Sequence, residues 1–140
     1  MNLGQLFIGI SIIALFSTFL DLGKHKHKVV FQFTNANDTL QQKAFTNQLN
    51  NLVAHWPNAE IEVVTYNHGI EYIMTSKSKH INDLLALNTK GVKFAVCQNT
   101  MNRLKITKDQ LLPFATVVPA GIAEIVEKQE KGWSYIKGGF

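Results

Sequence analysis

The chain has 140 residues, of which 46% are hydrophobic and 17% are charged, and its net charge is +4 with neutral histidines. This balance fits one domain with a real core and excludes an intrinsically disordered chain. The basic residues are scattered outside the cluster 24–28, and no basic patch is interleaved with aromatic residues. We therefore expect no nucleic-acid partner. The only cysteine, Cys97, excludes an internal disulfide.

The first 23 residues form a hydrophobic segment, separate from a domain that we expect over residues 24–140. Leu3 to Leu20 carries no charge and, at about 18 residues, is just long enough to span a bilayer. The basic cluster 24–28 follows at once and favours the cytoplasmic side for the domain. As an export signal, the segment lacks a leading Lys or Arg and a clear Ala-x-Ala cleavage site. Three alternatives stay open: an uncleaved membrane anchor, a signal removed on export to the periplasm, or an apolar helix docked on the domain or in an oligomer.

Beyond this segment, short runs rich in β-branched and aromatic residues alternate with segments of helical spacing. The run 27–33 predicts a strand, and the polar turn 35–38 can cap a helix that ends near Pro57. In chain order the patterns then predict a strand at 60–66, helical stretches at 70–74 and 80–87, a strand at 92–96, helical turns from 99 and 107, a strand at 115–118, a helix at 121–131 and an edge strand at 132–137.

This alternation favours βαβ units around a mainly parallel sheet. With five strands and right-handed crossovers, we expect a three-layer α/β/α sandwich with a flavodoxin-like arrangement. Each of the longer helices should bury one apolar face. The expected inward positions are Leu40, Ala44, Phe45, Leu49, Leu52, Val53 and Trp56 in the first helix, Ile81, Leu84 and Leu85 in the second, and Ile122, Ile125 and Val126 in the last.

Two common kinds of site find no support in the sequence. It has no Gly-x-Gly-x-x-Gly fingerprint and no Walker loop, so we expect neither a nucleotide nor another cofactor. Its histidines are dispersed around a lone cysteine without the spacing of a zinc site, so we expect no metal. Glu60 and Glu62 lie two apart on a predicted strand and face the same side, where we expect both to be solvated.

Cys97 is the first candidate for a functional residue, because it ends the apolar run 92–96 just as the chain turns polar. Ligands of open α/β sheets bind at the carboxyl edge of the strands. Backbone N–H groups and a helix start after the strand would favour the thiolate form, which is the nucleophile. The alternative is a buried cysteine that acts as a small, inert hydrophobic residue.

His68 is the second candidate, since it follows the predicted strand 60–66 in a polar loop, Asn67-His68-Gly69. If the two strand ends share one crevice, the imidazole could stabilise a thiolate or move a proton. A histidine beside a glycine in a loop can equally be an ordinary surface residue.

At these residues the sequence resembles the DsrE/DsrF-like family of small sulfur-relay proteins, in particular its stand-alone branch. The similarity covers about residues 28–137. It rests on five segments in a fixed order, which are Val29–Phe33, Ile61–Val64 with His68-Gly69, Gly91–Thr100, Val117–Gly121, and the helix and strand from Ile122 to Ile136.

The resemblance implies a flavodoxin-like domain that assembles into trimers or hexamers. It also implies that a cysteine at the position of Cys97 accepts and passes on sulfur as a persulfide. His68 matches the His-Gly loop of the family. From the surrounding polar positions we expect support for bound sulfur or an oxyanion from Asn67, Gly69, Gln98, Asn99 and Thr100.

The sequence thus yields two hypotheses of different classes. In the first, the protein is a sulfurtransferase-type carrier that passes sulfane sulfur through Cys97, takes it from a thiol or persulfide donor and hands it to an acceptor protein. In the second, it is an oligomeric ligand-binding or scaffold module in which Cys97 is inert. An apolar closing strand at 132–137 favours a homo-oligomer under either hypothesis.

Overall fold

Five parallel strands form one sheet in the computed structural model, which describes residues 26–140. They are β1 (Lys28–Asn35), β2 (Glu60–His68), β3 (Lys93–Cys97), β4 (Thr116–Val118) and β5 (Ser134–Lys137), in the order β4-β3-β2-β1-β5. All four neighbouring pairs are parallel. The predicted α/β fold with a parallel five-stranded sheet is therefore confirmed, and β5 lies at an edge as expected.

The expected hydrophobic segment 1–23 and the domain boundary after it lie outside the described residues. Within residues 26–140, no helix combines the length and the apolar character needed to cross a membrane.

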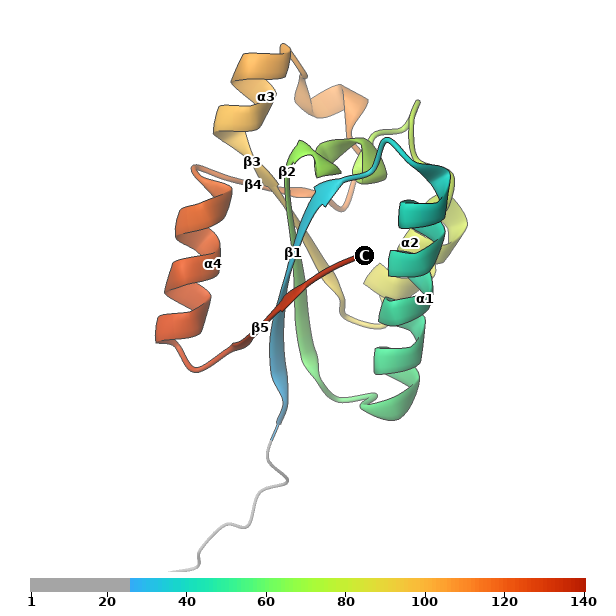
Figure 1. The fold of residues 1–140 in the computed structure, drawn as a ribbon, viewed down its shortest axis with the longest axis vertical. Helices are drawn as coiled ribbons and strands as arrows, with labels where there is room; N and C mark the ends of the chain where they lie inside the picture. Colours follow the sequence, from blue (N-terminus) through green and yellow to red (C-terminus); the bar gives the residue numbers. More distant parts are fainter. Residues whose placement is uncertain (1–25) are drawn as a thin grey trace, which may run out of the picture.

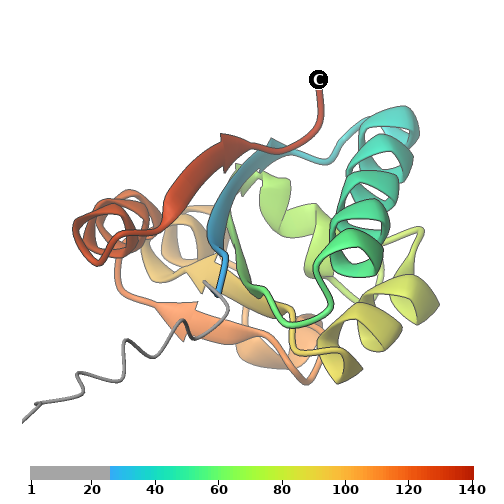
Figure 2. The same ribbon diagram turned by 90° about the horizontal axis from the view of Figure 1, so that it is seen from below.

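Helices cover both faces of the sheet, so that three layers result (Figures 1 and 2). The helices α1 (Thr39–His55) and α2 (Ile81–Thr89) and the 3-10 helix η1 (Gly69–Ile73) pack on one face, and α4 (Gly121–Glu130) packs on the other. Right-handed crossovers explain this division. From β1 to β4 the chain moves in one direction across the sheet, whereas β5 returns to the far side of β1 and its crossover helix lies on the opposite face.

Two short helical segments connect β3 to β4. The helix α3 (Gln98–Leu104) lies beyond the carboxyl end of β3 (Figure 1), and the 3-10 helix η2 (Lys108–Gln110) follows it. Thr107 and Gln110 cap η2 reciprocally, so the predicted helix start at 107 is present, although the helix is only a single turn.

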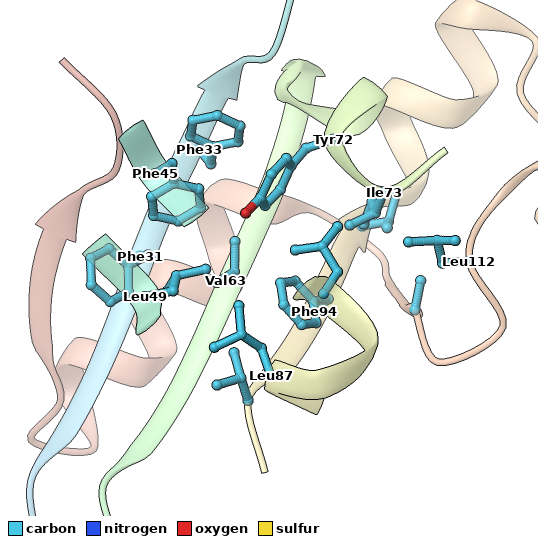
Figure 3. Close-up of a cluster of buried hydrophobic side chains, with 14 of the residues drawn as sticks. Phe31, Phe33, Phe45, Leu49, Val63, Tyr72, Ile73, Leu87, Phe94 and Leu112 are labelled. Atoms are coloured by element: carbon cyan, nitrogen blue, oxygen red, sulfur yellow. The ribbon is translucent and has the colours of Figure 1, made fainter. Parts of the chain in front are cut away.

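The main core lies between the sheet and the α1–α2 layer (Figure 3). At its centre, Phe45 stacks on Phe33 with ring centroids 4.3 Å apart and meets Phe31 edge-on at 5.5 Å. Tyr72 from η1 packs against both Phe33 and Phe45, and its hydroxyl bonds the Thr46 hydroxyl at 2.8 Å. This aromatic cluster joins β1, α1 and η1.

The opposite face has a much smaller core. Among the described residues, its buried cluster consists of four: Val30, Val64, Ala95 and Ile125. Tyr66, Val118 and Trp133 are partly buried around this cluster. The ten-residue helix α4 covers this face, which includes β3, the strand that ends at Cys97.

The inward face of α1 differs from the predicted one at its start. Leu40 is 64% exposed, whereas Gln41 and Gln42 are buried. Gln42 donates to the carbonyl of Ala36 and accepts from the N–H of Lys79, and Gln41 bonds the backbone of Phe140. These bonds satisfy the polar groups and compensate for their burial, which a count of apolar positions does not reveal.

The predicted inward faces of α2 and α4 were too wide. Leu84 and Ile125 are buried as expected, but Leu85, Ile122 and Val126 are 54%, 64% and 46% exposed, and Ile81 is at 37%. Both helices are short and touch the sheet along a narrow stripe, so the flanking apolar residues stay in solvent.

The predicted solvation of Glu62 was also wrong, because α4 covers this residue. Its carboxylate accepts a 2.7 Å ion pair from Lys128, which is also 3.5 Å from Glu124 and lies over the ring of Trp133. Burial raises the pKa of Glu62 more than Lys128 lowers it. Glu60, in contrast, pairs with Lys26 near the surface.

We expect the aromatic core to dominate stability. Phe45→Ala should lower the free energy of unfolding by about 3–5 kcal/mol, because it empties the space between three aromatic rings. Leu40→Ala, on the exposed side of the same helix, should change it by less than about 0.5 kcal/mol. Urea unfolding followed by circular dichroism measures both values, and equal losses in the two variants would contradict the packing described above.

Candidate functional site

The carboxyl ends of the parallel strands lie at one edge of the sheet (Figure 1), and the candidate residues stand at or next to these ends. Cys97 is the last residue of β3, Asn67 and His68 end β2, and Gly121 begins α4 directly after β4. The pairing of Cys97 with Val118 brings β4, and with it the start of α4, beside the cysteine.

Cys97 is 6% exposed and caps the amino end of α3. Burial raises the pKa of its thiol, but hydrogen bonds from the backbone N–H groups of Gly121, Thr100 and Asn99 and from the Thr100 hydroxyl outweigh burial and place the pKa below its ordinary value. These donors belong to the first turns of two different helices, α3 and α4, whose N–H groups have no partner within the helix. The arrangement favours a thiolate.

Gly121 permits this approach because it has no side chain. A Cβ atom there would lie 3.1 Å from Cδ1 of Tyr66 and 3.2 Å from Cβ of Cys97. Both contacts are tighter than ordinary van der Waals contact, so a larger residue would push the start of α4 away from the sulfur.

Thr100 links the cysteine to the end of β2. Its side chain is buried, and the N–H of Asn67 donates to its hydroxyl at 3.1 Å. Asn67 has a positive φ of 49°, a conformation that asparagine tolerates better than most residues. Its side-chain oxygen accepts a 2.9 Å bond from Nη2 of Arg103. The network therefore runs from the thiol through Thr100 and Asn67 to the guanidinium group.

Sequence reasoning missed two of these groups. The sequence marks Gly121 only as the end of one segment of the family resemblance and the start of the predicted helix 121–131, and it does not single out Arg103. A usable signal for Arg103 was present, since it is the only arginine in the chain and follows Cys97 by six residues. Gly121 contributes a backbone N–H. Since every residue except proline has one, the residue type does not identify this donor in the sequence.

The other predicted positions contribute less directly. Asn99 is exposed and offers its backbone N–H, and Gln98 uses its amide to bond Asn102 at 2.8 Å. Gly69 is buried against β1, where a Cβ would fall only 1.9 Å from the carbonyl oxygen of Phe33. We assign Gly69 a packing role on this evidence.

His68 lies at the same edge, but its ring pairs with Glu71 at 3.4 Å and its side chain is 55% exposed. The predicted loop at 67–69 was wrong in position, because β2 continues through His68. β2 is longer than predicted because β1 pairs with it as far as His68. Asn35 of β1 opposes His68 after a register shift, and the N–H of Ala36 donates to the carbonyl of His68. The groups that bond Cys97 are those of α3 and α4.

Within residues 26–140, no three His, Cys, Asp or Glu side chains lie close enough together to hold a metal ion. The groups around Cys97 provide the chemistry of a stabilised thiolate with neighbouring N–H and hydroxyl donors.

We expect Thr100→Val to raise the pKa of Cys97, since it removes one donor to the thiolate and frees Asn67. The rate of alkylation by iodoacetamide at pH 7 should fall by about three- to tenfold, equivalent to about 0.7–1.4 kcal/mol, which lies in the range of a typical net hydrogen bond. Thr65→Val is the matched control, because that buried hydroxyl bonds the carbonyl of Ala95 and not the sulfur. If both variants react at the same rate as the original protein across pH, the assigned role of Thr100 is wrong.

Comparison with known proteins agrees with this architecture. The sequence matches the model of the DsrE/DsrF-like family over residues 27–137. The structure is similar to that of the protein of unknown function MTH1491 from Methanobacterium thermoautotrophicum, with 31% identity and a TM-score of 0.75 over 80% of this chain and 99% of that one. No curated protein matches the chain at a significant level.

Two further solved structures share the fold at low identity. The ychN protein from E. coli has 10% identity and a TM-score of 0.67, over 79% of this chain and 98% of its own. The conserved protein of unknown function BT1422 from Bacteroides thetaiotaomicron has 15% identity and a TM-score of 0.57, over 79% and 93%. From the family match over most of its length, the chain belongs to the DsrE/DsrF-like family.

Proposed function

We propose that the protein carries sulfane sulfur as a persulfide on Cys97. The observation that carries the proposal is the convergence of N–H donors from α3 and α4 on the thiol, which lowers its pKa. Membership of the DsrE/DsrF-like family, whose relay proteins handle sulfur, supports the same assignment. Transfer of this kind needs a stabilised thiolate and no metal.

In the proposed cycle, the Cys97 thiolate attacks the outer sulfur of a sulfane-sulfur donor. The S–S bond of the donor breaks, its electron pair leaves on the remaining donor sulfur, and the product is Cys97–S–S⁻. The same donors that stabilise the thiolate would then stabilise the negative terminal sulfur. An acceptor thiolate attacks that sulfur and leaves Cys97 as a thiolate again. Because the chain has no second cysteine, every exchange takes place with another molecule.

The roles of the neighbouring residues follow from their contacts. Gly121, Asn99 and Thr100 donate to the sulfur, and Asn67 positions Thr100. His68 is held by Glu71, and we assign it no step in the transfer.

The intact protein incubated with a persulfide donor should gain a mass of about 32 Da, one sulfur atom added by thiol exchange. Cys97→Ser should abolish the gain, and dithiothreitol should reverse it. Intact-protein mass spectrometry measures the adduct. A thiol that stays unmodified by several donors while iodoacetamide labels it readily would rule out the carrier role.

An oligomeric ligand-binding or scaffold module is the second candidate, favoured by the apolar residues that α4 leaves in solvent. Ile122 and Val126 lie one turn apart and form an exposed stripe next to the candidate site, since Ile122 directly follows Gly121. Such a stripe is typical of a surface that is buried on association. We propose that copies of this chain associate through it into a trimer or hexamer, with or without sulfur chemistry.

Residues 24–140 should elute from a size-exclusion column with light-scattering detection at a multiple of the monomer mass. Ile122→Asp should shift the protein to the monomer, because the interface would have to bury a charge. Leu40→Asp is the matched control, since Leu40 on α1 is equally exposed at 64%. A monomeric original protein, or an equal effect of both substitutions, would contradict this interface.

A further inference from the structure

Packing explains neither the residue type nor the position of Arg103. The chain has fourteen basic residues, of which thirteen are lysines and only this one is an arginine. It lies in the last turn of α3, six residues after Cys97. Arginine differs from lysine in its planar fork of five N–H donors, which matches the oxygens of carboxylate, sulfonate and phosphate groups.

The guanidinium group has donors to spare. Within residues 26–140, its one hydrogen bond goes to the side-chain oxygen of Asn67, a neutral acceptor, and it forms no ion pair with a carboxylate. Acidic residues are absent from the whole stretch 84–108, which contains five basic ones. The surroundings of Arg103 along the chain therefore lack a negative charge that would neutralise it.

The bond to Asn67 holds the guanidinium group at the carboxyl end of β2, on the same hydrogen-bond network as the cysteine. Asn67 uses its side chain for Arg103 and its N–H for the hydroxyl of Thr100, which in turn bonds Cys97. A free arginine side chain would lose rotamer entropy on binding a ligand, and this contact removes part of that cost in advance.

We propose that Arg103 binds an oxyanion group on the compound that delivers sulfur to Cys97, so that the donor is a small anionic sulfane-sulfur compound. This inference rests on the proposed carrier function. The transfer is a balanced exchange. A bond forms between Sγ of Cys97 and the sulfane sulfur while the S–S bond of the donor breaks, and its electron pair leaves on the remaining donor sulfur. No external oxidant or reductant takes part.

A purely structural role for Arg103 makes a different prediction. A cation in the last turn of a helix interacts favourably with the helix dipole, by about 0.3–1 kcal/mol at an exposed site, an effect that would appear in stability alone. Anion binding would appear as charge selectivity at the thiol. The two roles can therefore be separated by measuring how reagent charge affects the reaction of Cys97.

The test uses two methanethiosulfonate reagents of similar size and opposite charge, with a sulfonatoethyl or a trimethylammonioethyl group. The thiolate attacks the reagent, forms a mixed disulfide and releases methanesulfinate. The ratio of the two rates on the full chain, divided by the ratio for 2-mercaptoethanol, measures the preference of the site for anions. Arg103→Gln should lower this corrected ratio by about two- to fivefold at ~0.1 M salt, from charges about 9 Å apart in a water-like medium.

Three controls sharpen the result. Arg103→Lys keeps the charge and should keep part of the preference, while Lys90→Gln removes an equal charge before β3, at the opposite edge of the sheet, and should leave the ratio unchanged. Added salt should reduce the preference of the original protein even if a variant fails to fold. A corrected ratio that favours the cationic reagent, or that is insensitive to Arg103→Gln and to salt, overturns the inference.

The corrected rate ratio, taken together with the mass measurement of persulfide on Cys97, distinguishes the two proposals. An anionic preference without any persulfide on Cys97 would refute the carrier function and leave anion binding by Arg103 standing. Persulfide formation, together with a corrected rate ratio that is insensitive to Arg103→Gln and to salt, would support the carrier function and refute the role of Arg103.

Discussion

The close approach of α4 to the cysteine strand is the constraint on which the site depends. Pairing of β3 with β4 places the start of α4 over Cys97, and the missing side chain of Gly121 lets the N–H group reach the sulfur. A buried thiol alone would have a raised pKa. Since two helix starts donate to it, the balance is reversed and a buried position becomes compatible with a reactive thiolate.

A partly buried charge cluster farther along α4 also constrains the position of this helix. Lys128 joins Glu62 of the sheet and Glu124 of the same helix, and it packs on Trp133. A buried ion pair adds little net stability, but it penalises every register of the helix in which a charge is left without a partner. One oxygen of Glu62 has no hydrogen-bond partner among the described residues. We infer that this cluster contributes orientation more than stability.

The sheet could be predicted from the sequence because its strands are continuous apolar runs, a pattern typical of strands buried on both faces. The strand-end position of Cys97 followed from the same pattern. Features that depend on partners far along the chain could not be predicted. Glu62 is buried because of Lys128, and Gln42 because of Ala36 and Lys79. The donors to Cys97 are mostly backbone groups, which residue types do not identify.

The unequal cores have a consequence for access to the site. Among the described residues, the α1 side packs a large aromatic cluster, whereas on the α4 side Ile125 packs on three buried residues of the sheet, Val30, Val64 and Ala95. Local opening free energies follow the amount of buried apolar contact, so α4 should separate from the sheet while the rest of the domain stays folded. Such opening would expose the sulfur and at the same time remove the N–H of Gly121 from it. The thiol would then be least stabilised as an anion when it is most accessible, so that access to the sulfur and stabilisation of its anion belong to two different positions of α4.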